Sequence, residues 1–72
     1  MIPVSFDYKD KHYQGTFSEV SGAAAKMWHL TIDGYHRGQL LLLDRGWAFF
    51  SNSGDFKELA DYFGEIVTLW YE

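Results

Sequence analysis

Cysteine is absent from the 72-residue chain, and the sequence holds only one proline and no long apolar run. Without cysteine the protein can form no disulfide, and the three histidines show no spacing typical of structural zinc. Very small folds usually depend on one of these cross-links, so here the hydrophobic core alone must stabilise the fold. This length allows a single domain over residues 1–72.

The chain also lacks the sequence features of export and membrane insertion. Its start has no basic segment followed by a long apolar stretch, and its longest aliphatic run covers only residues 40–43. A spanning helix needs about 20 consecutive apolar residues. We therefore expect no signal peptide, no transmembrane segment and no membrane partner, and by default a cytoplasmic location.

Basic residues are scarce and scattered along the sequence. Six lysines and arginines stand against ten aspartates and glutamates, which gives a formal net charge of -4. Such a surface repels a phosphate backbone on average, because nucleic-acid binding relies on clustered basic side chains. We expect no nucleic-acid partner.

Catalytic and ligand-binding motifs are missing as well. The sequence has no phosphate-binding glycine loop, nucleophile elbow, zinc signature or calcium loop. The one suggestive group is His29, His36 and Asp33, since both histidines are expected on one face of a hairpin with the aspartate nearby. Histidine also suits the solvent-exposed face of a hairpin, and a catalytic metal site usually needs three protein ligands. The sequence thus predicts no catalytic residue, no metal ligand and no cofactor.

Aromatic side chains, in contrast, are abundant and make up 19% of the residues. Each buried ring removes roughly 150 to 250 Å² from water, more than an aliphatic side chain does. Residues 2–9 alternate between apolar and polar, which is typical of a strand with one face in solvent. A two-residue turn at Asp10 and Lys11 would pair Tyr8 with Tyr13 and place the apolar partners on one face.

A second hairpin is expected around Asp33 and Gly34, the strongest turn signal in the sequence. A regular two-residue turn at this place leaves Leu40 on the face opposite to Trp28. One extra residue restores a common face, so the pattern predicts a β-bulge at Gly38, although a longer, five-residue loop would also restore it.

Two apolar strands follow, joined by a predicted three-residue loop at residues 44–46. Both strands are apolar on both sides, which is typical of strands that are covered above and below. In this register one face holds Leu41, Leu43, Trp47 and Phe49, and the other holds Leu40, Leu42, Ala48 and Phe50. We expect a helix to cover one face and the first hairpin to cover the other by curling the sheet over itself.

The spacing of Phe56, Leu59, Ala60 and Phe63 predicts a short amphipathic helix that ends at Gly64. The β-branched and aromatic residues at 66–71 favour a last strand, with continued helix as a tolerable alternative. The expected fold class is α+β, mainly β. It is a curved antiparallel sheet or partly closed barrel of about six strands, with one short helix before the last strand.

Three classes of function remain open. A small protein-interaction module or homo-oligomerising domain ranks first, because the chain offers aromatic surface but no reactive group of residues. A small apolar or carbohydrate ligand-binding domain ranks second and requires a concavity lined by tryptophans. An enzyme ranks third. The residues expected to contact a ligand or a partner, either another protein or a second copy, are Tyr35 at a hairpin end and Trp70 and Tyr71 in the last strand.

Overall fold

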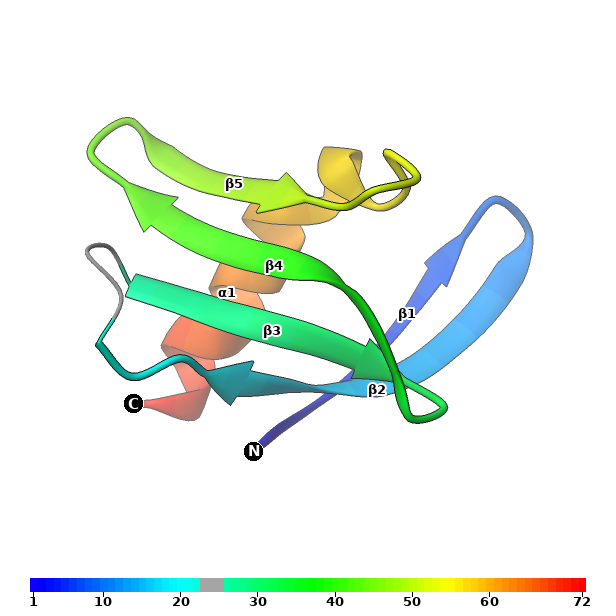
Figure 1. Ribbon diagram of the computed structural model, residues 1–72, viewed down its shortest axis with the longest axis horizontal. Helices are drawn as coiled ribbons and strands as arrows, with labels where there is room; N and C mark the ends of the chain where they lie inside the picture. Colours follow the sequence, from blue (N-terminus) through cyan, green and yellow to red (C-terminus); the bar gives the residue numbers. More distant parts are fainter. Residues whose placement is uncertain (23–25) are drawn as a thin grey trace.

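The computed structural model describes residues 1–22 and 26–72 as one curled antiparallel sheet with a helix behind it (Figure 1). The sheet has five strands in sequence order. The elements are β1 (Ile2–Tyr8), β2 (Lys11–Glu19), β3 (Lys26–Ile32), β4 (Tyr35–Leu43), β5 (Gly46–Phe50), the 3₁₀ helix η1 (Lys57–Leu59) and the helix α1 (Ala60–Trp70). Because the strand order follows the sequence, β1 and β5 form the two edges of the sheet.

The first hairpin turns one residue earlier than predicted. Lys9 and Asp10 have positive φ angles of 48° and 65°, as the two central residues of a type I′ turn require. Tyr8 therefore pairs with Lys11 and Phe6 pairs with Tyr13, so the predicted pairing of Tyr8 with Tyr13 is wrong. The earlier turn shifts the β2 partner of each β1 residue by two positions. Side chains alternate between the two faces of a strand, so a shift of two keeps the apolar side chains on one face.

The bulge in the second hairpin is confirmed. Thr31 pairs with His36 but Leu30 pairs with Gly38, so Arg37 is the extra residue of β4. Gly38 has a φ of 155°, and a Cβ atom there would come 2.5 Å from the carbonyl oxygen of Phe50. Only glycine fits this position, because both the backbone conformation and the close strand exclude a side chain.

The predicted register between β4 and β5 is wrong by one residue. The loop has two residues instead of three, since Gly46 pairs with Leu43 as the first residue of β5. The faces therefore regroup: Leu40, Leu42, Trp47 and Phe49 point toward the helix, whereas Leu41, Leu43, Ala48 and Phe50 point away from it. The expected composition of both faces is thus corrected.

The predicted last strand is also wrong, because residues 66–70 belong to the helix and Tyr71 caps its end. Its buried residues are Ala60, Phe63, Gly64 and Val67, which recur at the period of a helix and meet the sheet on one side. Gly64 does not end the helix but lies in its middle, pressed against the indole ring of Trp47. In the described part of the chain, no helix has the length and apolar character needed to cross a membrane.

One aromatic-rich core joins the sheet and the helix. Phe56, which has no solvent exposure, lies at its centre and contacts the rings of Phe6, Tyr13 and Phe49 at centroid distances of 5.2, 5.1 and 6.3 Å. Phe6 belongs to the first hairpin and Phe49 to β5, so the two ends of the sheet meet around one ring. The predicted curl is confirmed as a half-barrel, but the first hairpin and the helix cover the same face. The other face of β4 and β5 has no cover among the described elements (Figure 1).

We expect Gly64→Ala to destabilise the fold. A Cβ atom at this position would collide with three carbon atoms of the Trp47 indole ring. Overpacking of this kind costs about 1–3 kcal/mol, whereas replacing glycine by alanine inside a helix gains at most about 1 kcal/mol. Urea unfolding should show a net loss of about 1–2 kcal/mol, and Glu65→Ala, an exposed control in the same helix, should stay within about 0.5 kcal/mol of the wild type. Equal stability of the two variants would contradict the packing argument.

Candidate functional site

The outer face of the sheet, which points away from α1, carries an apolar area on β3, β4 and β5. Met27, Leu41 and Ala48 stand side by side in one row across these strands. Leu43 lies two residues from Leu41, and Phe50 lies two residues from Ala48, so both share this face. We call these five residues the outer apolar patch. Phe50 is its most exposed member, with 54% of its surface accessible.

The outer face of β1 and β2 differs sharply from this patch. Its positions are occupied by small or polar residues, namely Pro3, Ser5, Asp7, His12, Gln14, Thr16 and Ser18. The outer face of β1 and β2 is thus mainly polar. The outer apolar patch is a local feature of β3–β5 and is not a general property of this face.

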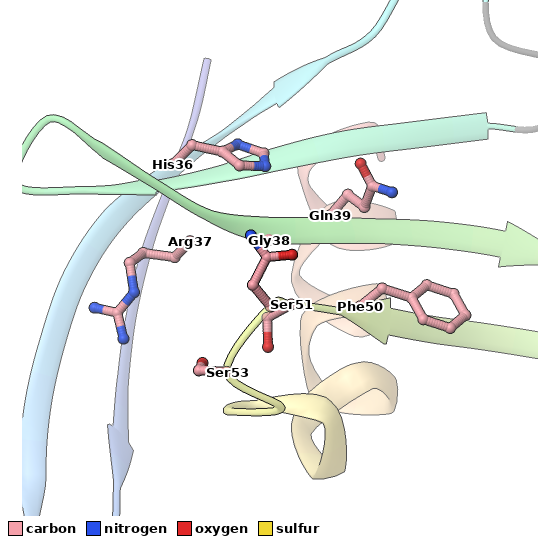
Figure 2. A pocket seen from close by; sticks show the side chains of 8 residues that line it. His36, Arg37, Gly38, Gln39, Phe50, Ser51 and Ser53 are labelled. Atoms are coloured by element: carbon pink, nitrogen blue, oxygen red, sulfur yellow. The ribbon is translucent and has the colours of Figure 1, made fainter.

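A polar cleft of about 370 Å³ adjoins the patch at the bulge of β4 (Figure 2). It is lined by His36, Arg37, Gly38, Gln39, Phe50, Ser51, Asn52 and Ser53. In Figure 2 the side chains of His36 and Arg37 leave β4 on opposite sides, as successive residues of a strand do. Phe50 belongs both to the cleft and to the outer apolar patch, so the two form one continuous surface.

The positive charge of Arg37 is neighboured by two aromatic rings and one carboxylate of the same chain. Its guanidinium group lies 5.0 Å from the ring centroid of Phe56 and 5.9 Å from that of Tyr13. Asp55 adds a carboxylate oxygen 3.9 Å from the nitrogen Nη2 of Arg37. The cleft therefore presents hydrogen-bonding groups such as the side chains of Gln39 and Ser51, and no carboxylate lines it. This arrangement suits a polar group of a partner.

A second concavity of about 390 Å³ lies between the C-terminal part of α1 and the sheet. Its lining residues are Glu19, Lys26, Trp28, Leu42, Trp47, Val67, Thr68 and Tyr71. We call it the tryptophan groove. The rings of Trp28 and Trp47 pack against each other at 5.5 Å, and Gly64 presses on Trp47, so the faces of both indoles are largely occupied. The indole nitrogen of Trp28 is buried without a hydrogen-bond partner among the described residues.

The predicted contact residues lie in separate places. Tyr35 is 73% exposed at the hairpin between β3 and β4, whereas Trp70 and Tyr71 are 54% and 61% exposed at the end of α1. Trp70 is the last residue of α1 and Tyr71 is its C-cap, so their predicted place in a last strand is wrong. The hydroxyl of Tyr71 donates to a carboxylate oxygen of Glu19 at 3.3 Å, beside the tryptophan groove. The hairpin between β3 and β4, which carries Tyr35, lies apart from the C-terminal end of α1, which carries Trp70 and Tyr71 (Figure 1).

The predicted neighbourhood of the two histidines is confirmed. The rings of His29 and His36 meet edge to face with centroids 4.6 Å apart on the outer face. Of His29, His36 and Asp33, only His36 lines the polar cleft, so the three side chains do not converge in one concavity. Within residues 1–22 and 26–72, no three histidine, aspartate or glutamate side chains are grouped in a way that would hold a metal ion.

Comparison with known proteins identifies no relative: no protein-family model matches the chain, and no curated protein or solved structure resembles it significantly. The interpretation of the site therefore rests on its geometry and chemistry.

The sequence pattern did not reveal the outer apolar patch or the lining residues that follow β5. The predicted cover by the first hairpin hides this face, whereas the hairpin and the helix in fact cover the same face. The predicted loop after Leu43 is also one residue too long, which exchanges the faces of β5. The bulge predicted at Gly38 was the one available signal for the polar cleft, since the cleft opens where the bulge interrupts β4.

We expect the protein to bind no transition metal at the histidine pair, because two imidazoles without a third ligand make a weak site. Micromolar zinc should leave the ring resonances of His29 and His36 unchanged in NMR spectra. Shifts of both residues at micromolar zinc would show that the pair binds metal and would contradict this expectation.

Proposed function

We propose that the protein is an interaction module that binds a protein partner through the outer apolar patch and the adjoining polar cleft. The observation that carries this proposal is the exposure of Phe50 at the centre of this combined surface. Protein interfaces commonly have an apolar centre bordered by polar groups, and a few aromatic anchors supply most of their binding energy.

The fold itself gives no reason for apolar residues at these positions. Burying an apolar side chain stabilises a protein because its surface leaves water, and Phe50 remains largely in water. Neighbouring outer positions on β1 and β2 show that this sheet accepts serine, threonine and glutamine on the same face. A partner that covers the patch supplies the burial that the monomer lacks.

Phe50→Ser should abolish partner binding while leaving the fold intact, because the side chain contributes little to the core. The matched control is Trp70→Ser, since both residues are 54% exposed and Trp70 lies at the end of α1. Each tagged variant is immobilised in equal folded amount and exposed to a cell extract together with an untagged copy of the chain. Bound proteins are then quantified by mass spectrometry.

Specific partners, including the untagged copy, should be retained by the wild type and by Trp70→Ser and reduced at least about ten-fold by Phe50→Ser, which corresponds to about 1.4 kcal/mol. Loss of binding with Trp70→Ser alone would place the interface at the end of α1. Equal retention by all three proteins would contradict the proposal.

A second candidate function is the binding of a small apolar ligand in the tryptophan groove. Its volume falls within the range of small-molecule sites, and its walls include two indoles, Leu42 and Val67. A carbohydrate is less well supported, because sugar stacking needs a free aromatic face and both indoles are packed.

Cyclohexanone, a small apolar ring, should therefore shift the indole ring resonances of Trp28 and Trp47, which line the groove, in a saturable way. Leu42→Phe should remove this response, because the larger ring fills the groove from its exposed side. A shift that does not saturate, or that persists in Leu42→Phe, would contradict ligand binding in the groove.

A further inference from the structure

The two edges of the sheet differ in how far they are blocked. The hydroxyl of Tyr62 donates to the carbonyl oxygen of Ser5 at 3.2 Å, so Ser5 directs its backbone groups away from β2. Backbone direction alternates along an antiparallel strand, so Pro3 also faces outward. Proline has no N–H group, so the free edge of β1 lacks a donor at Pro3. At Ser5 its acceptor is already occupied by Tyr62. A strand from another molecule finds few free partners there.

The edge formed by β5 is open. The carbonyl oxygen of Phe50 lies beside Gly38 of β4, so Phe50 directs its backbone groups toward β4. By the same alternation Ala48 faces β4, whereas Trp47 and Phe49 direct their N–H and C=O groups to the open edge. In the described part of the chain, the hydrogen bonds of turns and loops do not involve these groups of Trp47 and Phe49. Figure 1 shows β5 along the upper edge of the sheet, with η1 behind its C-terminal end.

The sequence of β5, Gly-Trp-Ala-Phe-Phe, is complementary to itself. If two copies pair antiparallel about Ala48, the open backbone groups of Trp47 meet those of Phe49 from the other copy. On the outer face, each Phe50 then stands opposite Gly46 of the other copy, and a ring across from glycine is a favourable cross-strand pair. No residue of β5 carries a charge, so two chains of net charge -4 meet along a neutral segment.

The same register brings the polar cleft of one copy close to a turn of the other. When Gly46 lies opposite Phe50, the turn at Asp44 and Arg45, which directly precedes Gly46, lies near the C-terminal end of β5 of the other copy. The polar cleft begins at that end, since Phe50 lines it, and the turn carries charged donors and acceptors. One symmetric arrangement thus uses the open edge, Phe50 and the cleft together.

We propose that the partner of this surface is a second copy of the chain, paired through the two β5 strands in antiparallel register about Ala48. This inference rests on the proposed interaction function and names its partner. The paired sheets form one continuous sheet, and the outer apolar patches of both copies lie next to each other across the new strand pair.

The absence of cysteine permits a direct test, because one introduced cysteine can form a protein–protein disulfide only with its equivalent in another copy, after oxidised glutathione has converted one of the two thiols to a mixed disulfide. Ala48 would occupy a pair without mutual hydrogen bonds, where side chains approach closely enough for a disulfide. With oxidised glutathione, Ala48→Cys should form a disulfide-linked dimer about ten-fold faster than Ser5→Cys, the control on the outer face of the blocked edge. Equal rates, or no dimer with Ala48→Cys, would overturn the inference.

A second variant avoids any effect of oxidation. Ala48→Lys places two positive charges opposite each other in the paired strands and should weaken self-association at least about ten-fold in sedimentation experiments. Unchanged self-association would overturn the arrangement about Ala48. If these tests fail but binding of another protein still depends on Phe50, the proposed interaction function stands. Only the inference that the partner is a second copy of the chain is then wrong. If Phe50→Ser changes no binding, the function itself fails.

Discussion

The contact between Gly64 and the indole ring of Trp47 determines how the two parts of this fold meet. It brings α1 within van der Waals range of β5 and places the helix on the face that carries Leu40 and Phe49. The described residues form only one α-helix, so no helix covers the opposite face of β4 and β5. The surface proposed for protein binding is therefore a direct consequence of where the helix packs.

Phe56 belongs to the same core, and its backbone adopts a strained conformation there. Its φ of 69° lies in the left-handed region, which a bulky residue rarely adopts and which costs on the order of 1–3 kcal/mol. The ring is fully buried among Phe6, Tyr13 and Phe49, and the guanidinium group of Arg37 lies over it. Burial of a phenylalanine contributes a free energy of similar size, so tertiary contacts hold the strained backbone in place. Arg37 is the extra residue of the bulge and links this core to the polar cleft.

The surface and the core thus share residues of the bulge. Gly38 permits the close approach of β4 to Phe50, and the interruption at Arg37 opens the cleft beside the outer apolar patch. The two edges of the sheet differ in the same region of the fold. Pro3 and Tyr62 block β1, whereas β5 has free backbone groups next to the exposed Phe50. The association proposed at β5 rests on this asymmetry between the two edges.

Local patterns in the sequence determined the strands, the second hairpin turn and the bulge at Gly38. Alternation and glycine placement act over a few residues, and the register between Trp28 and Leu40 is set by their parity. Only the tertiary structure decided that residues 66–70 are helical, because Val67 gains its burial from contact with the sheet, and this burial outweighs its β-propensity. The faces of β5 depended in the same way on a loop one residue shorter than the pattern suggested. The sequence pattern therefore could not predict the exposed surface around Phe50, because a register shift of one residue exchanges the buried and exposed sides of a strand.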